Sequence, residues 1–262
     1  MNTDNLFRIS MILIASLIAL FIVAPIISMF VHTSVPDLLE TWTDIDVQRS
    51  IWITLLTAFA ATTFFGLMGI PLAFLLARND FRGKRIVLGL IDLPIVIPHT
   101  AAGIALLGFI SKKSTMGKLA SAVGIDFVGH TPGIAIAMAF VSIPFLLNAA
   151  RNGFEAVPER LEKTALSLGT SPARVFFTIS LPLAKKSILS GLVMMFARGM
   201  SEFGAIVIIA YHPMTTPVLI FERFGAYGLQ YARPVAVLFV MVSLIVFILF
   251  GMLHSGRNKN ER

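Results

Sequence analysis

The chain has 262 residues, of which 56% are hydrophobic and 13% charged, and it contains no cysteine. Its mean hydropathy of +0.86 excludes an ordinary soluble domain, and the lack of cysteine excludes disulfides, thiolate metal sites and a cysteine nucleophile. The net charge of +7 does not call for a nucleic-acid partner, because basic residues also collect on one side of a membrane protein.

Six apolar stretches predict an all-α integral membrane protein, because roughly twenty residues of helix cross about 30 Å of hydrocarbon. The stretches are Ile9–Val31, Ile51–Ala77, Ile86–Ile110, Gly133–Ala150, Ala184–Ala210 and Pro234–Leu253. The first is too long for a cleaved signal peptide, and no small-x-small cleavage site follows it. We therefore expect residues 1–50 to form an N-terminal transmembrane helix and an outer loop.

The distribution of Lys and Arg predicts the orientation of the spans. With both termini on one side, that side carries fourteen basic residues and the opposite side six. This excess places the N- and C-termini in the cytoplasm of a multi-pass protein of the cell membrane. The basic loop Arg78–Arg85 then faces the cytoplasm, where it is a positive-inside anchor in preference to a lipid-headgroup or nucleotide site.

The third span begins with two prolines and two polar residues. Pro94 and Pro98 are four residues apart, so both should bend one helical face and free backbone carbonyls. His99 and Thr100 follow directly. A bent helix lined by polar groups suits a gate or a cavity wall, although a hydrogen-bonded packing histidine is an equal alternative.

A short polar helix is predicted between the fourth and fifth spans. Pro158 suits a first helical position, acidic residues occupy the first turn, and Gly169 suits the residue after the end. Leu161, Ala165 and Leu168 recur at i, i+4 and i+7, so they form one apolar stripe. A second start follows, with Ser171 as N-cap and Pro172 at the first position. We expect a surface helix that offers its stripe to a groove in a partner.

This segment resembles the EAA loop of type I ABC importer permeases, whose pattern is Glu-Ala-Ala, three residues, Gly, nine residues, Ile, one residue and Leu-Pro. Five positions match in register, namely Ala165, Gly169, Ile179, Leu181 and Pro182. Lys163 and Thr164 replace the usual Glu and Ala, and Glu162 stands one residue early. The other interpretation of the segment is an ordinary cytoplasmic connector helix.

The resemblance implies a coupling helix that docks in a cleft of a separate ATPase subunit. The coupling residues that it implies are Glu159, Leu161, Glu162, Lys163, Ala165, Leu168, Gly169, Ser171 and Pro172. It also implies a permease core over residues 51–253, a cytoplasmic tail over residues 254–262, a homodimer, two ATP-binding cassette subunits and an extracytoplasmic binding protein. ATP and magnesium would bind the partner ATPase, and this chain would hold no cofactor.

The fifth span contains two charged residues that are expensive to place in a membrane. Arg198 and Glu202 are separated by four residues and can pair on one helix face. Such charges usually face a bundle interior or a water-filled path, and Ala197, Ser201 and Ala205 would give that helix a small-residue face. We therefore assign Arg198, Ser201 and Glu202, with Pro94, Pro98, His99 and Thr100, to a translocation path or gate. A structural ion pair is the alternative.

Two further segments favour one branch of the importer family. IPHTAAGIAL resembles the oxyanion permeases, and ARGMSEFGA resembles the corresponding segment of molybdate, tungstate and sulfate permeases. The outer segment Tyr211–Arg233 is more similar to that of molybdate/tungstate permeases. It would contact a binding protein, or else form an aromatic belt at the interface.

We therefore predict the permease subunit of an ATP-driven importer of a tetrahedral oxyanion, molybdate or tungstate, that works by alternating access. No phosphate-binding GxxxxGK[ST] motif, nucleophile elbow or metal-ligand spacing occurs, so the chain itself should not be an enzyme. Two alternatives remain: the same role for sulfate or thiosulfate, and a secondary transporter that uses Asp92, His99, Arg198 and Glu202 as an ion relay.

Overall fold

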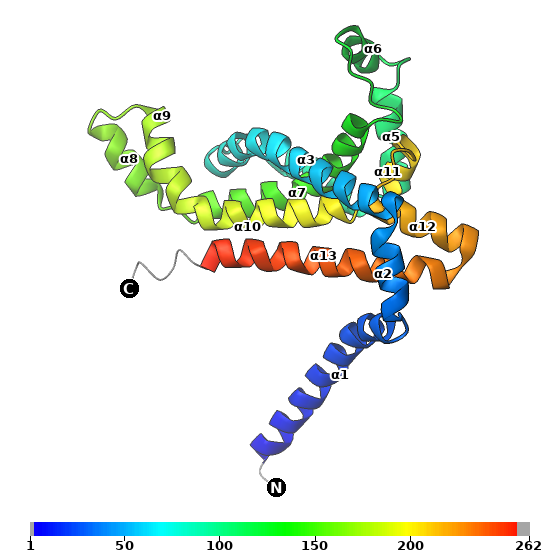
Figure 1. Cartoon of the computed structure of the whole chain (residues 1–262). Coiled ribbons are helices and arrows are strands. Elements are labelled where there is room, and N and C mark those ends of the chain that lie inside the picture. The colour runs from blue at the N-terminus through cyan, green and yellow to red at the C-terminus, as the bar shows by residue number, and fades with distance from the viewer. Residues whose placement is uncertain (1–2, 256–262) are drawn as a thin grey trace. The chain divides into compact units, whose positions relative to one another are not determined.

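The computed structural model describes residues 3–255, and every regular element within them is helical (Figure 1). Among residues 3–255, five helices are long and apolar enough to cross a membrane, and a bent pair of helices makes a sixth span if it is counted as one. These helices confirm the predicted all-α membrane fold. The chain divides into two compact units, Met1–Gln48 with Ile220–Arg262 and Arg49–Leu219.

The first unit contains the two terminal spans and the helices that follow or precede them. They are α1 (Thr3–Val31), α2 (Val35–Thr43), most of α12 (Thr216–Tyr227) and α13 (Leu229–Ser255). A capping box formed by Ser34 and Asp37 starts α2, as such a box does when each side chain satisfies the other residue's backbone N–H. Arg223 of α12 forms an ion pair with Asp44, the residue just after α2. This pair connects the end of α2 to α12.

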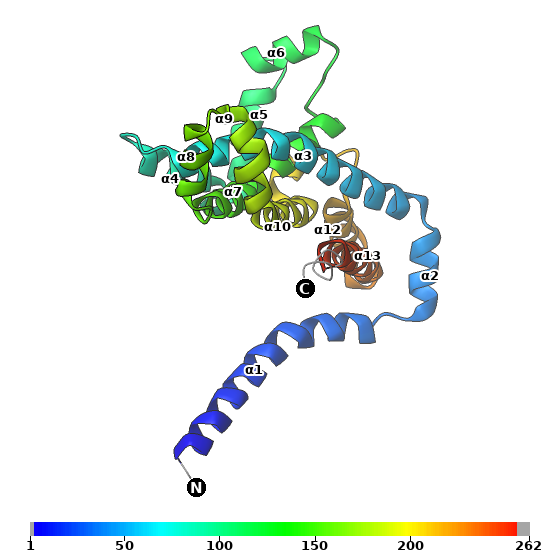
Figure 2. The same ribbon diagram turned by 90° about the vertical axis from the view of Figure 1, so that its left-hand side faces the viewer.

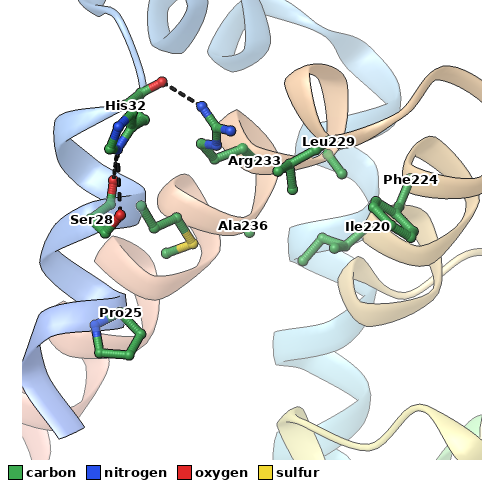
Figure 3. A pocket seen from close by; sticks show the side chains of 10 residues that line it. Pro25, Ser28, His32, Ile220, Phe224, Leu229, Arg233 and Ala236 are labelled. Atoms are coloured by element: carbon green, nitrogen blue, oxygen red, sulfur yellow. Dashed lines mark hydrogen bonds between the residues drawn. The ribbon is translucent and has the colours of Figure 1, made fainter. Parts of the chain in front are cut away.

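A hollow of about 480 Å³ lies between α1 and α13 in this unit (Figure 3). Arg233 closes its polar end by donating to the His32 backbone oxygen at 2.7 Å. The rest of the lining is largely apolar and includes Pro25, Phe224 and Leu229. An apolar hollow between two membrane-spanning helices suits lipid tails or another helix rather than a charged substrate.

The second unit holds the remaining spans and the surface helices. It contains most of α3 (Ile45–Arg78), then α4 (Lys84–Val96), α5 (His99–Ile110), α6 (Thr115–Ala122), α7 (Thr131–Glu155), α8 (Glu159–Ser167), α9 (Pro172–Val175), a π-helical turn η1 (Phe176–Ser180), α10 (Leu181–Met200) and α11 (Gly204–Ile209). Helices α8 and α9 lie at one end of α7 and α10, whereas α5, α6 and α11 lie at the other (Figure 1).

Helices α7 and α10 pack side by side along their length, and Figure 2 views them end-on. Glycines make the close approach possible: a Cβ at Gly153 would lie 2.5 Å from the Ser187 Cβ, and one at Gly191 would lie 2.9 Å from the Ala149 Cβ. Membrane helices associate through such close packing, because lipid provides no hydrophobic drive between them. This pair is therefore the centre of the second unit.

Two of the predicted continuous spans are in fact broken, which corrects the sequence prediction. The third span is two helices, α4 and α5, that meet at 114°. Pro98 has no N–H to continue α4, and it holds Ile97 in an extended conformation with ψ of 147°, as a proline does to its predecessor. The fifth span stops at Met200 and resumes as the separate helix α11.

The other boundaries shift outward from the predicted ones. The second span begins at Ile45, the fourth at Thr131 and the sixth at Leu229. Polar residues at these ends extend each helix beyond its apolar run, because helical hydrogen bonding does not stop where hydrophobicity does. Of the predicted tail over residues 254–262, only the first two residues belong to α13, and the others lie outside the described residues.

Candidate functional site

Helix α8 is a short surface helix with a sharply defined end. Gly169 has φ of +82°, the Thr170 N–H donates to the Ala165 oxygen at 3.1 Å, and the Gly169 N–H donates to the Leu166 oxygen at 2.9 Å. These two bonds are a Schellman motif, in which glycine takes the left-handed position without a Cβ penalty. The stop predicted at Gly169 is confirmed.

The predicted apolar stripe of α8 is largely uncovered in this chain. Leu161 is 41% exposed and Leu168 is 81% exposed, and Ala165 between them is half-buried. Glu159 and Lys163 form an exposed i,i+4 pair at 2.7 Å on the same helix, and an exposed pair of this kind adds little to stability. The stripe is thus available to a partner, with charges beside it.

The elements that flank α8 confirm one predicted cap and correct another. Ser171 accepts a hydrogen bond from the Arg174 N–H, and Pro172 is the first residue of α9, as predicted. Pro158 was expected at the first helical position, but it is the N-cap, with ψ of 117°. The extended ψ places its carbonyl at the helix start, and Glu159 becomes the first helical residue.

Glu162 is the buried member of the predicted coupling set, and its partner was not foreseen. Arg78, the last residue of α3, donates Nε to Glu162 Oε2 at 2.8 Å and Nη2 to Oε1 at 2.7 Å. Ser180 donates its hydroxyl to Oε1 at 2.7 Å. Burial alone would raise the pKa of the Glu162 carboxyl, but the hydrogen bonds from Arg78 and Ser180 outweigh it and leave that pKa lowered.

The predicted path residues meet where α10, α11 and α5 come together. Arg198 Nη2 donates to Glu202 Oε2 at 2.9 Å, and His99, the first residue of α5, lies 2.9 Å from the same oxygen through Nδ1. Glu202 Oε1 accepts the Ala205 N–H at 2.8 Å. The Glu202 side chain is fully buried, whereas that of Arg198 is 23% exposed.

Glu202 and Ser201 lie in the break rather than on a continuous helix, so two expectations are corrected. Arg198 and Glu202 pair as predicted, but across the end of α10. The small-residue face of Ala197, Ser201 and Ala205 does not exist as one face, because the chain turns after Met200. The turn lets the Glu202 carboxylate satisfy a backbone N–H of α11, which explains its position.

Glycines bring the two broken spans into contact. A Cβ at Gly204 would lie 2.7 Å from the His99 Cβ, and one at Gly103 would lie 2.9 Å from the Ala205 backbone. Pro94 and Pro98 do not share a helix, contrary to prediction: Pro94 is buried in α4, and Pro98 is the exposed residue at the bend. Thr100 and Ser201 are exposed. Thr100 follows His99 in the chain, and Ser201 precedes Glu202.

Two polar contacts within the second unit were missed from the sequence. Asp92 of α4 accepts a hydrogen bond from the Asn148 amide of α7 at 2.6 Å. Thr54 and Thr216 are fully buried, and the Thr216 N–H donates to the Thr54 hydroxyl at 2.8 Å. Each of these two contacts joins residues that are far apart in the chain. The only sequence signal for them is a polar residue inside an apolar run.

The site combines a bend between helices with charged side chains. In the described part of the chain no group of three or more His, Cys, Asp or Glu could hold a metal ion. A bundle with a broken span, a charged cluster at the break and an exposed surface helix is the architecture of a membrane transport subunit. The same fold occurs in the crystal structure of a bacterial ABC transporter involved in the import of the acidic polysaccharide alginate, with a TM-score of 0.74, 17% identity and 96% of each chain covered.

Residues 69–256 match the family of binding-protein-dependent transport system inner membrane components, and the chain belongs to that family. It is thus an ABC importer permease. The molybdate/tungstate transport system permease protein WtpB of Pyrococcus abyssi is 43% identical over 242 residues, which cover 92% of each chain. The probable sulfate transport system permease protein cysT of Chlorokybus atmophyticus is 35% identical over 204 residues, 76% of this chain and 71% of the other.

Proposed function

We propose that this chain is the membrane subunit of an ATP-driven importer of molybdate or tungstate. The observation that carries the proposal is the 43% identity over 92% of both chains with a permease named for molybdate and tungstate. The relative named for sulfate is less similar and matches a smaller part of this chain, so sulfate is the second candidate.

The working complex that we propose is a homodimer of this chain with two ATPase subunits and an outer oxyanion-binding protein. ATP and magnesium would bind the ATPase subunits alone. The exposed Leu161 and Leu168 of α8 supply the apolar surface for an ATPase groove, in the manner of an amphipathic helix in a cleft. Both termini and α8 would be cytoplasmic, which the excess of basic residues on that side supports.

The translocation path that we propose passes the cluster of His99, Arg198 and Glu202. Glu202 is fixed by Arg198 and by the Ala205 N–H, while the Arg198 side chain is 23% exposed. A partly exposed arginine suits contact with a tetrahedral dianion. Closure of the ATPase subunits would move α8 and tilt the spans, so that the path opens alternately to each side.

Reconstitution into proteoliposomes tests this function. The complex with its ATPase and binding protein should accumulate molybdate or tungstate only when ATP is supplied on the cytoplasmic face, and excess sulfate should compete weakly. Uptake of sulfate in preference to molybdate would favour the second candidate. Uptake that follows a proton or sodium gradient without ATP would contradict the proposal and favour a secondary transporter.

A further inference from the structure

The attachment of α8 to the rest of the second unit is unusual for a surface helix. Its buried side chain is the carboxylate of Glu162, whereas its leucines are exposed. Apolar contacts are not directional, so an apolar anchor would not fix the orientation of the helix. A buried carboxylate is costly unless it is paired and hydrogen-bonded, so this one must be held by specific partners.

The two partners of Glu162 come from two other parts of the fold. Arg78 is the last residue of the long helix α3 and binds both carboxylate oxygens at 2.7 and 2.8 Å. Ser180 closes the π-helical turn that leads into α10, and it donates to the same carboxylate. Arg78 also donates Nη2 to the backbone oxygen of Val157, between α7 and α8, at 3.1 Å.

An aromatic cluster of Phe74, Phe154 and Phe176 lies next to this contact. The Phe74 ring of α3 lies 5.2 Å from Phe154 of α7 and 4.9 Å from Phe176 of the π-helical turn, in edge-on packing. The Arg78 guanidinium carbon lies 6.0 Å from the Phe74 ring centre. The ring contacts fix the ends of three elements, and the two-pronged Arg–Glu pair adds a fixed orientation that a single hydrogen bond lacks.

We propose that Arg78 is a positioning residue that couples movement of α8 to α3. Through Glu162, α8 is joined to the end of α3 as well as to its neighbours in the chain, so a displacement imposed on α8 also displaces α3. Without Arg78, α8 would keep the Ser180 hydrogen bond and its packing against α9 and the π-helical turn, but it would lose this link to α3. This inference rests on the proposed function, because it assumes that a partner moves α8.

The decisive variant is Arg78→Met, which keeps the length of the side chain and removes both prongs. The matched control is Asp80→Asn, which removes the neighbouring exposed ion pair between Lys84 and Asp80 at 2.9 Å. Arg78→Lys keeps the charge but cannot bind both oxygens in a fixed plane. If Arg78→Met fails to assemble, Arg78→Lys carries the test.

Two measurements on the reconstituted complex separate transmission from simple folding. In Arg78→Met, molybdate uptake per ATP hydrolysed should fall at least about tenfold, equivalent to about 1.4 kcal/mol, while ATP hydrolysis continues and the complex stays assembled. Hydrogen exchange of the α8 amides should accelerate. Arg78→Lys should fall between wild type and Arg78→Met, and Asp80→Asn should match wild type in both measurements.

The possible failures are distinguishable. Unchanged uptake per ATP and unchanged α8 exchange in Arg78→Met, or full activity of Arg78→Lys where Arg78→Met fails to assemble, would overturn the role of Arg78. Accelerated exchange with unchanged uptake per ATP would also overturn it, because the pair would then hold α8 without transmitting movement.

If the wild-type complex takes up no oxyanion, the proposed function itself fails. In that case stimulation of ATP hydrolysis by the binding protein, lost in Arg78→Met and kept in Asp80→Asn, still reports on the pair.

Discussion

The second unit contains two Arg–Glu pairs that differ in the geometry of the contact between arginine and carboxylate. Glu162 takes both prongs of Arg78 and a Ser180 hydroxyl, and its partners lie 84 and 18 residues away in the chain. Arg198 and Glu202 are four residues apart and share one short contact through Nη2. The first pair joins separate elements, whereas the second is local and lies at a break.

The two arginines also differ in how far their side chains are exposed. The Arg78 side chain is 11% exposed, and its carboxylate partner is equally covered. The Arg198 side chain is 23% exposed while Glu202 is fully buried, and Arg198 Nη1 reaches Ser201 only at 3.5 Å. A covered, two-pronged pair suits the transfer of force, and a more exposed arginine beside a fixed carboxylate suits contact with a passing anion.

The largest effect should come from breaking the pair at the break in the fifth span. Arg198→Met leaves the Glu202 carboxylate uncompensated and should cost about 3–5 kcal/mol of stability. In the double variant Arg198→Met/Glu202→Gln stability should return, while molybdate uptake stays impaired because the anion contact is gone. Thermal unfolding and uptake by the reconstituted complex check both parts. Recovery of uptake together with stability would make this pair purely structural.

The pair at α8 should give a smaller loss of stability, since the Arg78 and Glu162 side chains are each 11% exposed whereas Glu202 is fully buried. Glu162→Leu should strand the Arg78 guanidinium and cost about 3 kcal/mol, and Arg78→Met/Glu162→Leu should regain most of it, because apolar replacements of a buried pair are often neutral. Denaturation of the single and double variants in parallel measures the difference. A double variant as unstable as Glu162→Leu would mean that the stability depends on the hydrogen bonds of Ser180 and Val157 to this pair.

Gly204→Ala should have a moderate effect by separating α11 from α5. The added Cβ would lie 2.7 Å from the His99 Cβ, and such overpacking costs about 1–3 kcal/mol. His99 would be pushed from Glu202, so uptake should fall as well. Gly108→Ala in α5 meets nothing within 4 Å and is the matched control, which should keep both stability and uptake. Equal behaviour of the two variants would argue against a tight contact at Gly204.

The smallest effect concerns acid stability at α8. The folded-state pKa of Glu162 is lowered below its ordinary value of 4.5, because the hydrogen bonds from Arg78 and Ser180 outweigh the opposing effect of burial. The stabilisation is therefore complete above the ordinary pKa and is lost as the pH falls through the lowered one. Unfolding of wild type and Glu162→Gln should converge below pH 4.5. A constant gap between them at all pH values would mean that this carboxyl does not titrate with unfolding.

Much of the fold could be predicted from local sequence patterns, and the long-range pairs could not. Apolar runs located the spans, and the glycine and serine signals placed the end of α8 and the start of α9, because caps depend on neighbouring residues only. Pro98 signalled a bend, but the 114° break depends on how α5 packs against α11. The Arg78–Glu162 contact joins residues 84 positions apart, and no periodicity reveals such a partner. Glu162 was singled out, but as a surface residue.

Cysteine labelling can show whether α8 faces the cytoplasm and docks on an ATPase, as we propose. The chain has no cysteine, so Ser171→Cys and Thr43→Cys each introduce a unique thiol at an exposed position. Ser171→Cys should react with an impermeant maleimide only from the cytoplasmic side and should be protected when the ATPase subunit is bound, while Thr43→Cys should react only from outside. Labelling of Ser171→Cys from outside, or no protection by the ATPase, would contradict the account.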